Sequence, residues 1–580
     1  MNDNRVPLNR KTVMYGAAIL SVAGLVIKIL GAVFRIPLGN LIGTDGMGYY
    51  NAVYPVYTIL VVVGASGIPV AVSRLVAEYN TEGDSAGATR VLKISATLMS
   101  IVGVGFFCAL FFGAAGITSR MTSLSDAVVG MQAIAPALLF IPIMAVFRGY
   151  FQGLQNMKPT AVSQLVEQAF RVIAGLSLAY FLISDGKAAA AAGGNFGATA
   201  GAVGGLATLL IVYVRMRNAV SYRNRRDNAR LARERAKQEP TGSIIKKIVV
   251  IALPITVGAM IMPIMYNIDV WVVPARLLSA GFSHEQVVSM YGQLSGFAEP
   301  LTNLPKVLTQ AIAISMVPTI VRAWKEKDKE FLHYNITLGF RFALIIGLPC
   351  TVGLMILAKP VMLLLYPMQI EGASGAASAL FIFAIGIMFL SSIDALTSAL
   401  QGVGRQMIPF VNIAVGAGCK FVLTFFLTAI PQVNIQGAAS GTVVAYAVAT
   451  VLNYRAVRIY TGVRFNVKLT FLRPIISALV MGGVVAAVYY GIQHAIGNSA
   501  ASLAGLAEFA SEQLHKDMTV AIFANALTTI VAILVGIIVY ILMLFVTRAI
   551  SPEELRLLPK GEKLFRFYKK ITRRRISSKR

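Results

Sequence analysis

The sequence predicts an all-α polytopic membrane protein with fourteen transmembrane helices. Of its 580 residues, 57% are apolar and only 13% are charged, and the mean hydropathy is +0.71. A soluble chain carries about 25% charged residues, so this composition excludes an ordinary soluble enzyme. Apolar stretches long enough to cross a bilayer, about 20 residues each, recur along the chain, and basic residues gather in alternate loops.

Fourteen stretches meet the length and composition of a membrane span. The first is too long for the apolar core of a signal peptide and lacks an obvious small-residue cleavage site, so we expect it to remain in the protein. The predicted spans are 12–36, 49–73, 91–114, 127–148, 160–183, 192–214, 248–275, 291–321, 332–357, 376–400, 408–429, 436–454, 474–493 and 519–547.

The distribution of Lys and Arg predicts the orientation of these spans. With the N-terminus inside, 41 of the 52 basic residues lie in cytoplasmic segments and 5 on the opposite side. Cytoplasmic loops of membrane proteins carry such an excess, so both termini are predicted to be cytoplasmic. The net charge of +27 therefore needs no nucleic-acid partner. The basic loop 215–247 and the basic tail 551–580 are expected to lie along the anionic lipids of the inner leaflet.

An internal repeat predicts two bundles of six spans each. Gln152-Gly153, followed by Met157 and Pro159, matches Gln401-Gly402, followed by Met407 and Pro409. Since six is even, both bundles face the same way, related by a pseudo-two-fold axis along the membrane normal, with a substrate site between them near the midplane. A duplication without a central cavity is the structural alternative. The predicted divisions are 1–214 (first bundle), 215–247 (basic loop), 248–460 (second bundle), 461–550 (helices 13 and 14) and 551–580 (basic tail).

Ten charged residues fall inside the predicted spans. A charge facing lipid at the bilayer centre costs about 2.5–3.5 kcal/mol on insertion scales, so these residues must pair or line water. Six bases against four acids leave a surplus of positive charge. The ten are Lys28, Arg35, Glu167, Arg171, Asp269, Glu299, Lys306, Arg341, Asp394 and Lys420.

The bases predict a water-filled cationic cavity for an anionic substrate. Ammonium and guanidinium groups bind phosphate oxygens, Lys as a point charge and Arg as a two-pronged donor. A large amphiphile with a diphosphate would place its head in this cavity while its tail stays in lipid. The predicted substrate-binding residues are Lys28, Arg35, Arg171, Lys306 and Lys420.

The acids predict coupling or gating. Glu167 and Arg171 are four residues apart and should pair on one helix face. Asp269, Glu299 and Asp394 are candidates for binding Na⁺ or H⁺. Each is equally interpretable as a salt-bridge partner that holds one state closed, and this interpretation is favoured for Asp269 and Asp394.

The sequence predicts a transporter that is not an enzyme and that needs no cofactor or metal. It has no Gly-x-x-x-x-Gly-Lys-Ser/Thr loop for ATP, and the three cysteines have no metal-ligand spacing. Two alternatives remain open beside a flippase. One is an ion-coupled multidrug exporter, although the surplus of bases disfavours cationic drugs. The other is a polytopic enzyme that polymerises glycans, for which Ser499 to Asp517 is the candidate outer loop.

Specific motifs resemble a known family over roughly residues 10–550. The run Arg148-Gly-Tyr-Phe-Gln-Gly153, then Pro159-Thr-Ala-Val-Ser-Gln164 and Glu167-Gln168, looks like the MOP exporter superfamily. Within it the chain resembles the polysaccharide-transport branch of stage V sporulation protein B and MurJ-type lipid II flippases, whose basic residue before Leu-Gly in the first span matches Lys28. The resemblance implies alternating access in a bacterial plasma membrane and export of an undecaprenyl diphosphate-linked saccharide, such as lipid II, for cell-wall or polysaccharide synthesis.

Overall fold

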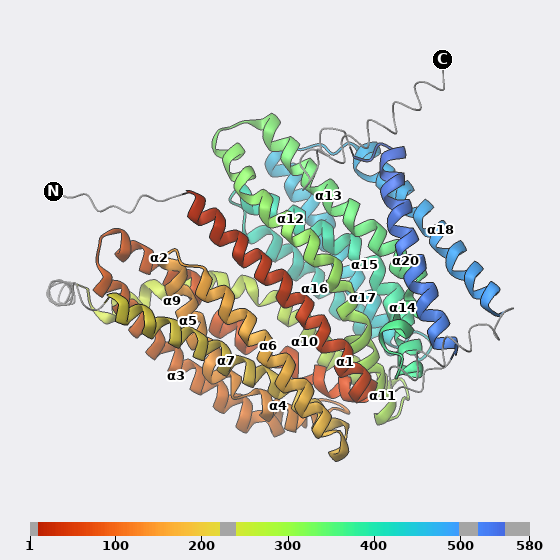
Figure 1. The fold of residues 1–580 in the computed structure, drawn as a ribbon, viewed down its shortest axis with the longest axis horizontal. Coiled ribbons are helices and arrows are strands. Elements are labelled where there is room, and N and C mark those ends of the chain that lie inside the picture. Colours follow the sequence, from red (N-terminus) through yellow and green to blue (C-terminus); the bar gives the residue numbers. More distant parts are fainter. Residues whose placement is uncertain (1–9, 221–238, 498–519, 551–580) are drawn as a thin grey trace. The chain divides into compact units, whose positions relative to one another are not determined.

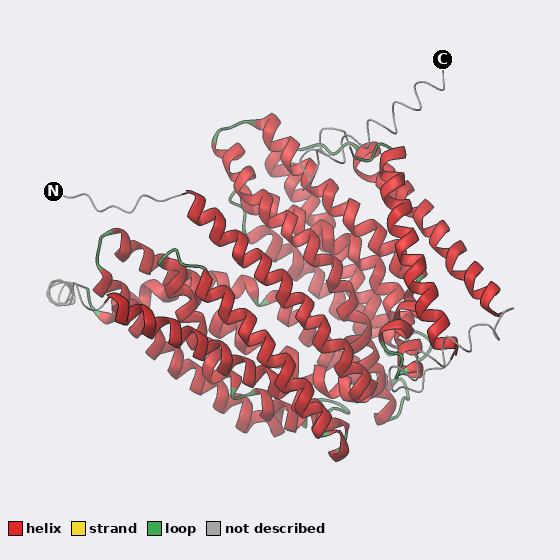
Figure 2. Cartoon of the chain, in the orientation of Figure 1, coloured by secondary structure: helices red, strands yellow, loops and turns green. Residues whose placement is uncertain are grey.

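The computed structural model describes residues 10–220, 239–497 and 520–550, and this part of the chain is built from helices joined by short loops (Figures 1 and 2). No β-strand occurs within these ranges. The all-α membrane class predicted from the composition is therefore confirmed. The basic tail, most of the basic loop and most of the outer loop 494–518 lie outside the described residues.

The chain forms two compact units. Unit 1 comprises residues 1–297 and 417–441, and unit 2 comprises residues 298–416 and 442–580. The division into repeated six-span bundles, and the axis that relates them, stay predictions.

Unit 1 is made mainly of helices from the first half of the chain. Within it, α6 and α7 pack along each other, and α5 packs on α2 and α3. The helices are α1 (Arg10–Ala65), α2 (Ile68–Thr81), α3 (Ser85–Thr118), α4 (Val128–Ile134), α5 (Ala137–Gly153), α6 (Lys158–Phe181), α7 (Lys187–Val220), α9 (Thr241–Ala259), α10 (Ile261–Ser279), α11 (His284–Gly292) and the end of α16 (Met407–Leu427).

Unit 2 is centred on three long helices, α12, α13 and α15, which pack against one another. A second pair, α18 and α20, packs together beside α13. The helices are α12 (Glu299–Lys325), α13 (Lys329–Ile356), α14 (Ala358–Leu365), α15 (Ile370–Gly402), the start of α16, α17 (Ile435–Thr461, mostly in this unit), α18 (Arg473–Gly497) and α20 (Val520–Val546).

Twelve of the described helices are long and apolar enough to cross a membrane, or thirteen if the bent pair over 125–153 is one span. The fourteen predicted spans differ from these in three places. The first two spans are continuous with each other in α1, where two helices meet at a non-helical break at Gly43, while the span over 248–275 is divided at Met260 into α9 and α10. The fifth span is α6, which carries Glu167 and Arg171 and is not among the twelve.

The long helix α1 is broken at Gly43, where α11 packs against it. Gly43 has a φ of 70°, a conformation that favours glycine. Beside the break, the hydroxyls of Thr44 and Ser289 are 2.8 Å apart. A β-carbon on Gly292 of α11 would lie 1.8 Å from the Thr44 carbonyl oxygen. The contact between α1 and α11 therefore requires glycine at position 292.

Gly292→Ala is expected to separate α11 from α1 and to destabilise unit 1 by about 1–3 kcal/mol, the usual cost of overpacking. The measurement is the midpoint of thermal unfolding in detergent. Gly105→Ala in α3 is the matched control, because a β-carbon there would meet nothing within 4 Å. Equal midpoints for the two variants would show that the contact at Gly292 is not needed.

Candidate functional site

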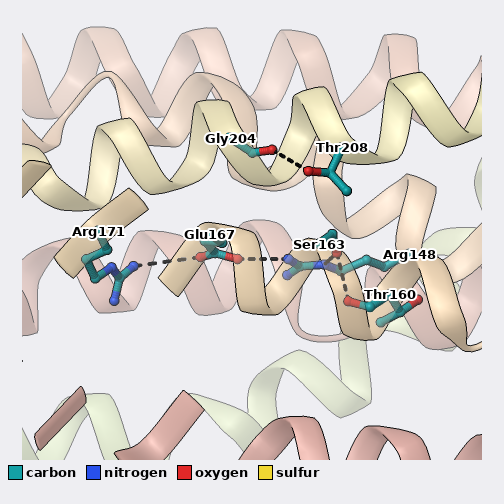
Figure 3. A network of polar contacts seen from close by, with 7 residues as sticks. All are labelled: Arg148, Thr160, Ser163, Glu167, Arg171, Gly204 and Thr208. Carbon is teal, nitrogen blue, oxygen red and sulfur yellow. Dashed lines mark hydrogen bonds and ion pairs between the residues drawn. The ribbon is translucent and has the colours of Figure 1, made fainter. Parts of the chain in front are cut away.

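A charged network links α5 and α6 within unit 1 (Figure 3). Glu167 lies between two arginines: the Arg148 guanidinium donates to Glu167 Oε2 at 2.8 Å, and Arg171 Nη2 lies 3.7 Å from Oε1. All three side chains are less than a fifth exposed. The predicted pairing of Glu167 with Arg171 is present, but the shorter contact is with Arg148.

Arg148 is firmly anchored. Its Nε donates to the Ser163 hydroxyl at 3.1 Å, and that hydroxyl donates to the Thr160 carbonyl at 2.8 Å (Figure 3). Together with the bond to Glu167, these contacts use the Nε and Nη2 atoms of the guanidinium. Arg148 is therefore fixed against the first three turns of α6.

Arg171 is held much more loosely. Its distance of 3.7 Å to Glu167 exceeds the hydrogen-bond range of about 2.7–3.2 Å. Its Nη1 donates to the Tyr54 hydroxyl at 3.3 Å, and its buried Nε has no hydrogen-bond partner among the described residues. A guanidinium has five N–H donors, so Arg171 retains donors for a further acceptor.

Glycines of α7 place α6 for this network. A β-carbon on Gly201 would lie 2.6 Å from the Glu167 carbonyl, and one on Gly197 would lie 2.6 Å from the Arg171 carbonyl. Small residues let helix backbones approach closely in membranes.

Thr208 lies one turn after Gly204 on α7. Its hydroxyl donates a hydrogen bond to the Gly204 carbonyl of the same helix and is thereby satisfied (Figure 3).

A row of aromatic side chains on α1 lies beside Arg171. Tyr50 stacks on Tyr54 with ring centroids 6.2 Å apart, and Phe34 and Tyr57 extend the row at either end. Arg35 lies half-buried on α1, next to Phe34 in the sequence. We call Arg148, Glu167 and Arg171 the unit 1 cluster; with two bases and one acid, its formal charge is +1. Such a cluster suits an anionic group.

Lys420 is in a different environment from the one predicted for it. It is 1% exposed, and its ammonium donates to Asp269 Oδ2 at 2.6 Å and to the Met265 carbonyl at 3.1 Å. Burial removes Lys420 from water, and Asp269 neutralises it. In this conformation Lys420 therefore offers no free charge to a substrate, and the salt-bridge interpretation favoured for Asp269 agrees with the contact.

The remaining predicted residues lie at separate places. Lys28, on α1, is exposed, and Lys306, Glu299 and Asp394 are half-buried in unit 2. Asp394 accepts from the Thr309 hydroxyl at 3.3 Å. Their predicted roles in substrate binding and coupling stay predictions.

Arg341, the remaining intramembrane charge, is buried in unit 2, where its guanidinium donates to the Ala549 carbonyl just beyond α20. This contact satisfies a backbone acceptor at a helix end. Its role is therefore structural.

Arg148 ends the predicted span 127–148 and was not among the predicted site residues. The short turn after Gly153 brings the end of α5 beside the start of α6, so Arg148 faces Ser163 and Glu167. A base shortly before such a turn and an acid shortly after it are the signal that would have indicated the pair.

Comparison with known proteins now adds to this geometry. Residues 13–324 match the polysaccharide biosynthesis protein family. The chain belongs to this family. It is thereby placed in the polysaccharide-transport branch of the MOP superfamily, as the motifs around Arg148 and Glu167 predicted.

Relatives from Bacillus subtilis (strain 168) cover most of the chain. The uncharacterized membrane protein YabM is 31% identical over 79% of this chain and 82% of its own length. Stage V sporulation protein B is 27% identical over 95% of this chain and 98% of its own. Lipid II flippase MurJ is 27% identical over 80% of this chain and 86% of its own.

Solved structures share the fold. A lipid II flippase MurJ in an inward closed conformation covers 91% of this chain and 98% of its own, with a TM-score of 0.63 and 15% identity. An inward-facing multidrug resistance MATE family transporter covers 76% of this chain and 98% of its own, with a TM-score of 0.62 and 16% identity. The chain is thus a multi-pass membrane protein that shares the fold of these transporters.

Proposed function

We propose that this protein is an alternating-access flippase that exports a lipid-linked saccharide of the undecaprenyl diphosphate type, with lipid II as the candidate cargo. The protein acts in the bacterial plasma membrane, with both termini in the cytoplasm. The exported saccharide is used in cell-wall or polysaccharide synthesis. Family membership and the similarity to a relative named lipid II flippase MurJ support this function.

The single observation that carries the proposal is the unit 1 cluster. Two arginines and one glutamate lie together on helices of a membrane protein, and Arg171 keeps unused donors beside a row of tyrosines. Guanidinium groups recognise phosphate oxygens in a two-pronged geometry. A diphosphate headgroup would supply the negative charge and the acceptors that this cluster lacks.

The fold similarity to a MATE transporter favours a second candidate, an ion-coupled multidrug exporter. Cationic drugs require a surplus of acids at the binding site. The unit 1 cluster has the opposite surplus, which supports the flippase.

Ion coupling is part of the proposal, through Na⁺ or H⁺. Glu299 and Asp394, half-buried in unit 2, are the candidates for binding the coupling ion. Asp269 already holds the Lys420 ammonium, so an ion bound there would have to displace an internal cation.

Complementation tests the function. Expression of this chain in a bacterium depleted of its own lipid II flippase is expected to restore growth and the accessibility of labelled precursor at the outer surface. Restored growth without outward precursor would contradict flipping. Failure of both, with the protein present in the membrane, would contradict lipid II as cargo and leave other undecaprenyl diphosphate-linked saccharides as the substrates to be assayed.

A further inference from the structure

We propose that Glu167 pairs with Arg171 in the absence of substrate. Arg148 is the positioning residue that lets Arg171 leave Glu167 for the phosphate of the substrate. The inference rests on the proposed function and assigns roles within the unit 1 cluster. Arg171 touches the substrate, Glu167 competes with the substrate for Arg171, and Arg148 keeps Glu167 neutralised throughout.

The two arginines differ in how tightly they are bound. Arg148 makes two hydrogen bonds, at 2.8 Å to Glu167 and at 3.1 Å to Ser163. Arg171 makes only one long bond, 3.3 Å to Tyr54, and approaches Glu167 no closer than 3.7 Å. Of the two cations on Glu167, Arg171 is therefore the one that can be withdrawn.

The charge of Glu167 explains why a second arginine is needed. A carboxylate at this depth, 19% exposed, is costly when it has no counter-ion. If Arg171 were the only partner of Glu167, its move to a phosphate would leave the carboxylate without a counter-ion. That cost would weaken the binding of the phosphate. Because Arg148 bonds Oε2 and Arg171 faces Oε1, the carboxylate keeps one cation after Arg171 has turned away.

The unsatisfied groups near Arg171 mark where the substrate oxygen would be received. Arg171 Nε and the Tyr57 hydroxyl are both buried without a hydrogen-bond partner among the described residues. Tyr54, which accepts from Arg171 at 3.3 Å, lies next to Tyr57 with ring centroids 5.9 Å apart. An anionic oxygen would neutralise Arg171 once its side chain has turned from Glu167, whereas a neutral sugar hydroxyl would leave the positive charge of Arg171 without a counter-ion.

The test is a double-mutant cycle on headgroup binding, with the full-length protein in lipid nanodiscs and undecaprenyl diphosphate as the probe. Arg148→Gln is expected to raise the Kd about tenfold, within the usual range of coupling between sites, because Glu167 then retains Arg171. Glu167→Gln is expected to bind at least as tightly as the wild type. In an Arg171→Gln background, the further change Arg148→Gln should alter the Kd by less than about twofold.

Two controls separate this role from a purely structural one. Arg74→Gln removes one partner of an exposed i,i+4 ion pair with Glu78 and should leave the Kd unchanged. Arg148→Lys keeps a charge beside Glu167 and should retain most of the affinity. Unfolding midpoints measured on every variant show whether a change in Kd reflects loss of folded protein.

The proposal is overturned if Glu167→Gln binds more weakly than the wild type, or if Arg148→Gln costs the same affinity with and without Arg171. Should Arg148→Gln fail to fold, the Glu167→Gln arm still decides. A wild-type protein that does not bind undecaprenyl diphosphate would overturn the proposed function and this inference together, whereas tight wild-type binding with a failed cycle overturns the inference alone.

Discussion

Lys420→Met is expected to destabilise unit 1 by about 3–5 kcal/mol, the usual cost of removing one partner of a buried ion pair. Lys420 is 1% exposed, and its ammonium contacts both Asp269 and the Met265 carbonyl. Without it, the Asp269 carboxylate is left as an uncompensated charge, and its Oδ1 already has no partner among the described residues. Methionine matches the length of the lysine stem, so the loss is one of charge rather than volume.

The measurement is thermal unfolding followed by tryptophan fluorescence in detergent. Trp271 lies two residues from Asp269 on α10 and reports on this region. The double variant Lys420→Met/Asp269→Leu removes both charges and is expected to recover most of the lost stability, because a hydrophobic pair of similar volume replaces a buried ion pair at little cost. A Lys420→Met protein as stable as the wild type would show that the pair is not the tie between α10 and α16.

Arg171→Gln is expected to weaken binding of a diphosphate headgroup by about 10- to 100-fold, the equivalent of a lost charge-assisted hydrogen bond of about 1.5–3 kcal/mol. The reason is that Arg171 is the loosely held cation of the unit 1 cluster, with its Nε unpartnered. Flipping in proteoliposomes should fall in parallel. Folding is expected to be preserved, since Glu167 keeps its 2.8 Å bond to Arg148.

The matched variant is Arg341→Gln. Arg341 is also a buried arginine within a predicted span, but it donates to the Ala549 carbonyl and belongs to unit 2. Arg341→Gln should lower the unfolding midpoint without changing the Kd of the folded fraction for the diphosphate headgroup. If Arg171→Gln changes only stability and Arg341→Gln changes binding, the assignment of the cluster to the substrate is wrong.

The sequence predicted the membrane class, the family and the Glu167–Arg171 pair, because each depends on composition, a local motif or helical spacing. It did not predict Arg148 as the main partner of Glu167, nor Lys420 as the partner of Asp269. These contacts join residues 19 and 151 positions apart. The Arg148–Glu167 pair has only the short turn between α5 and α6 as its signal. The Lys420–Asp269 pair is set by how distant helices pack, and a single sequence carries no direct signal for it.

The break between the first two spans shows the same limit in another form. Hydropathy predicted a gap between these spans, since polar residues such as Asn40 and Asp45 interrupt the apolar run. The non-helical break lies inside that gap, at Gly43. The contact of Thr44 with Ser289 of α11 beside the break joins residues 245 positions apart, and hydropathy carries no signal for it.

Headgroup selectivity of flipping tests the central claim most directly. The purified protein is reconstituted into liposomes with a fluorescent saccharide linked to undecaprenol through a diphosphate, and separately with the same saccharide on a neutral linkage. Accessibility to a membrane-impermeant quencher reports the movement between leaflets. The unit 1 cluster predicts that the diphosphate-linked lipid is flipped and the neutral one is not, and equal rates for the two would contradict recognition of the substrate through its phosphates.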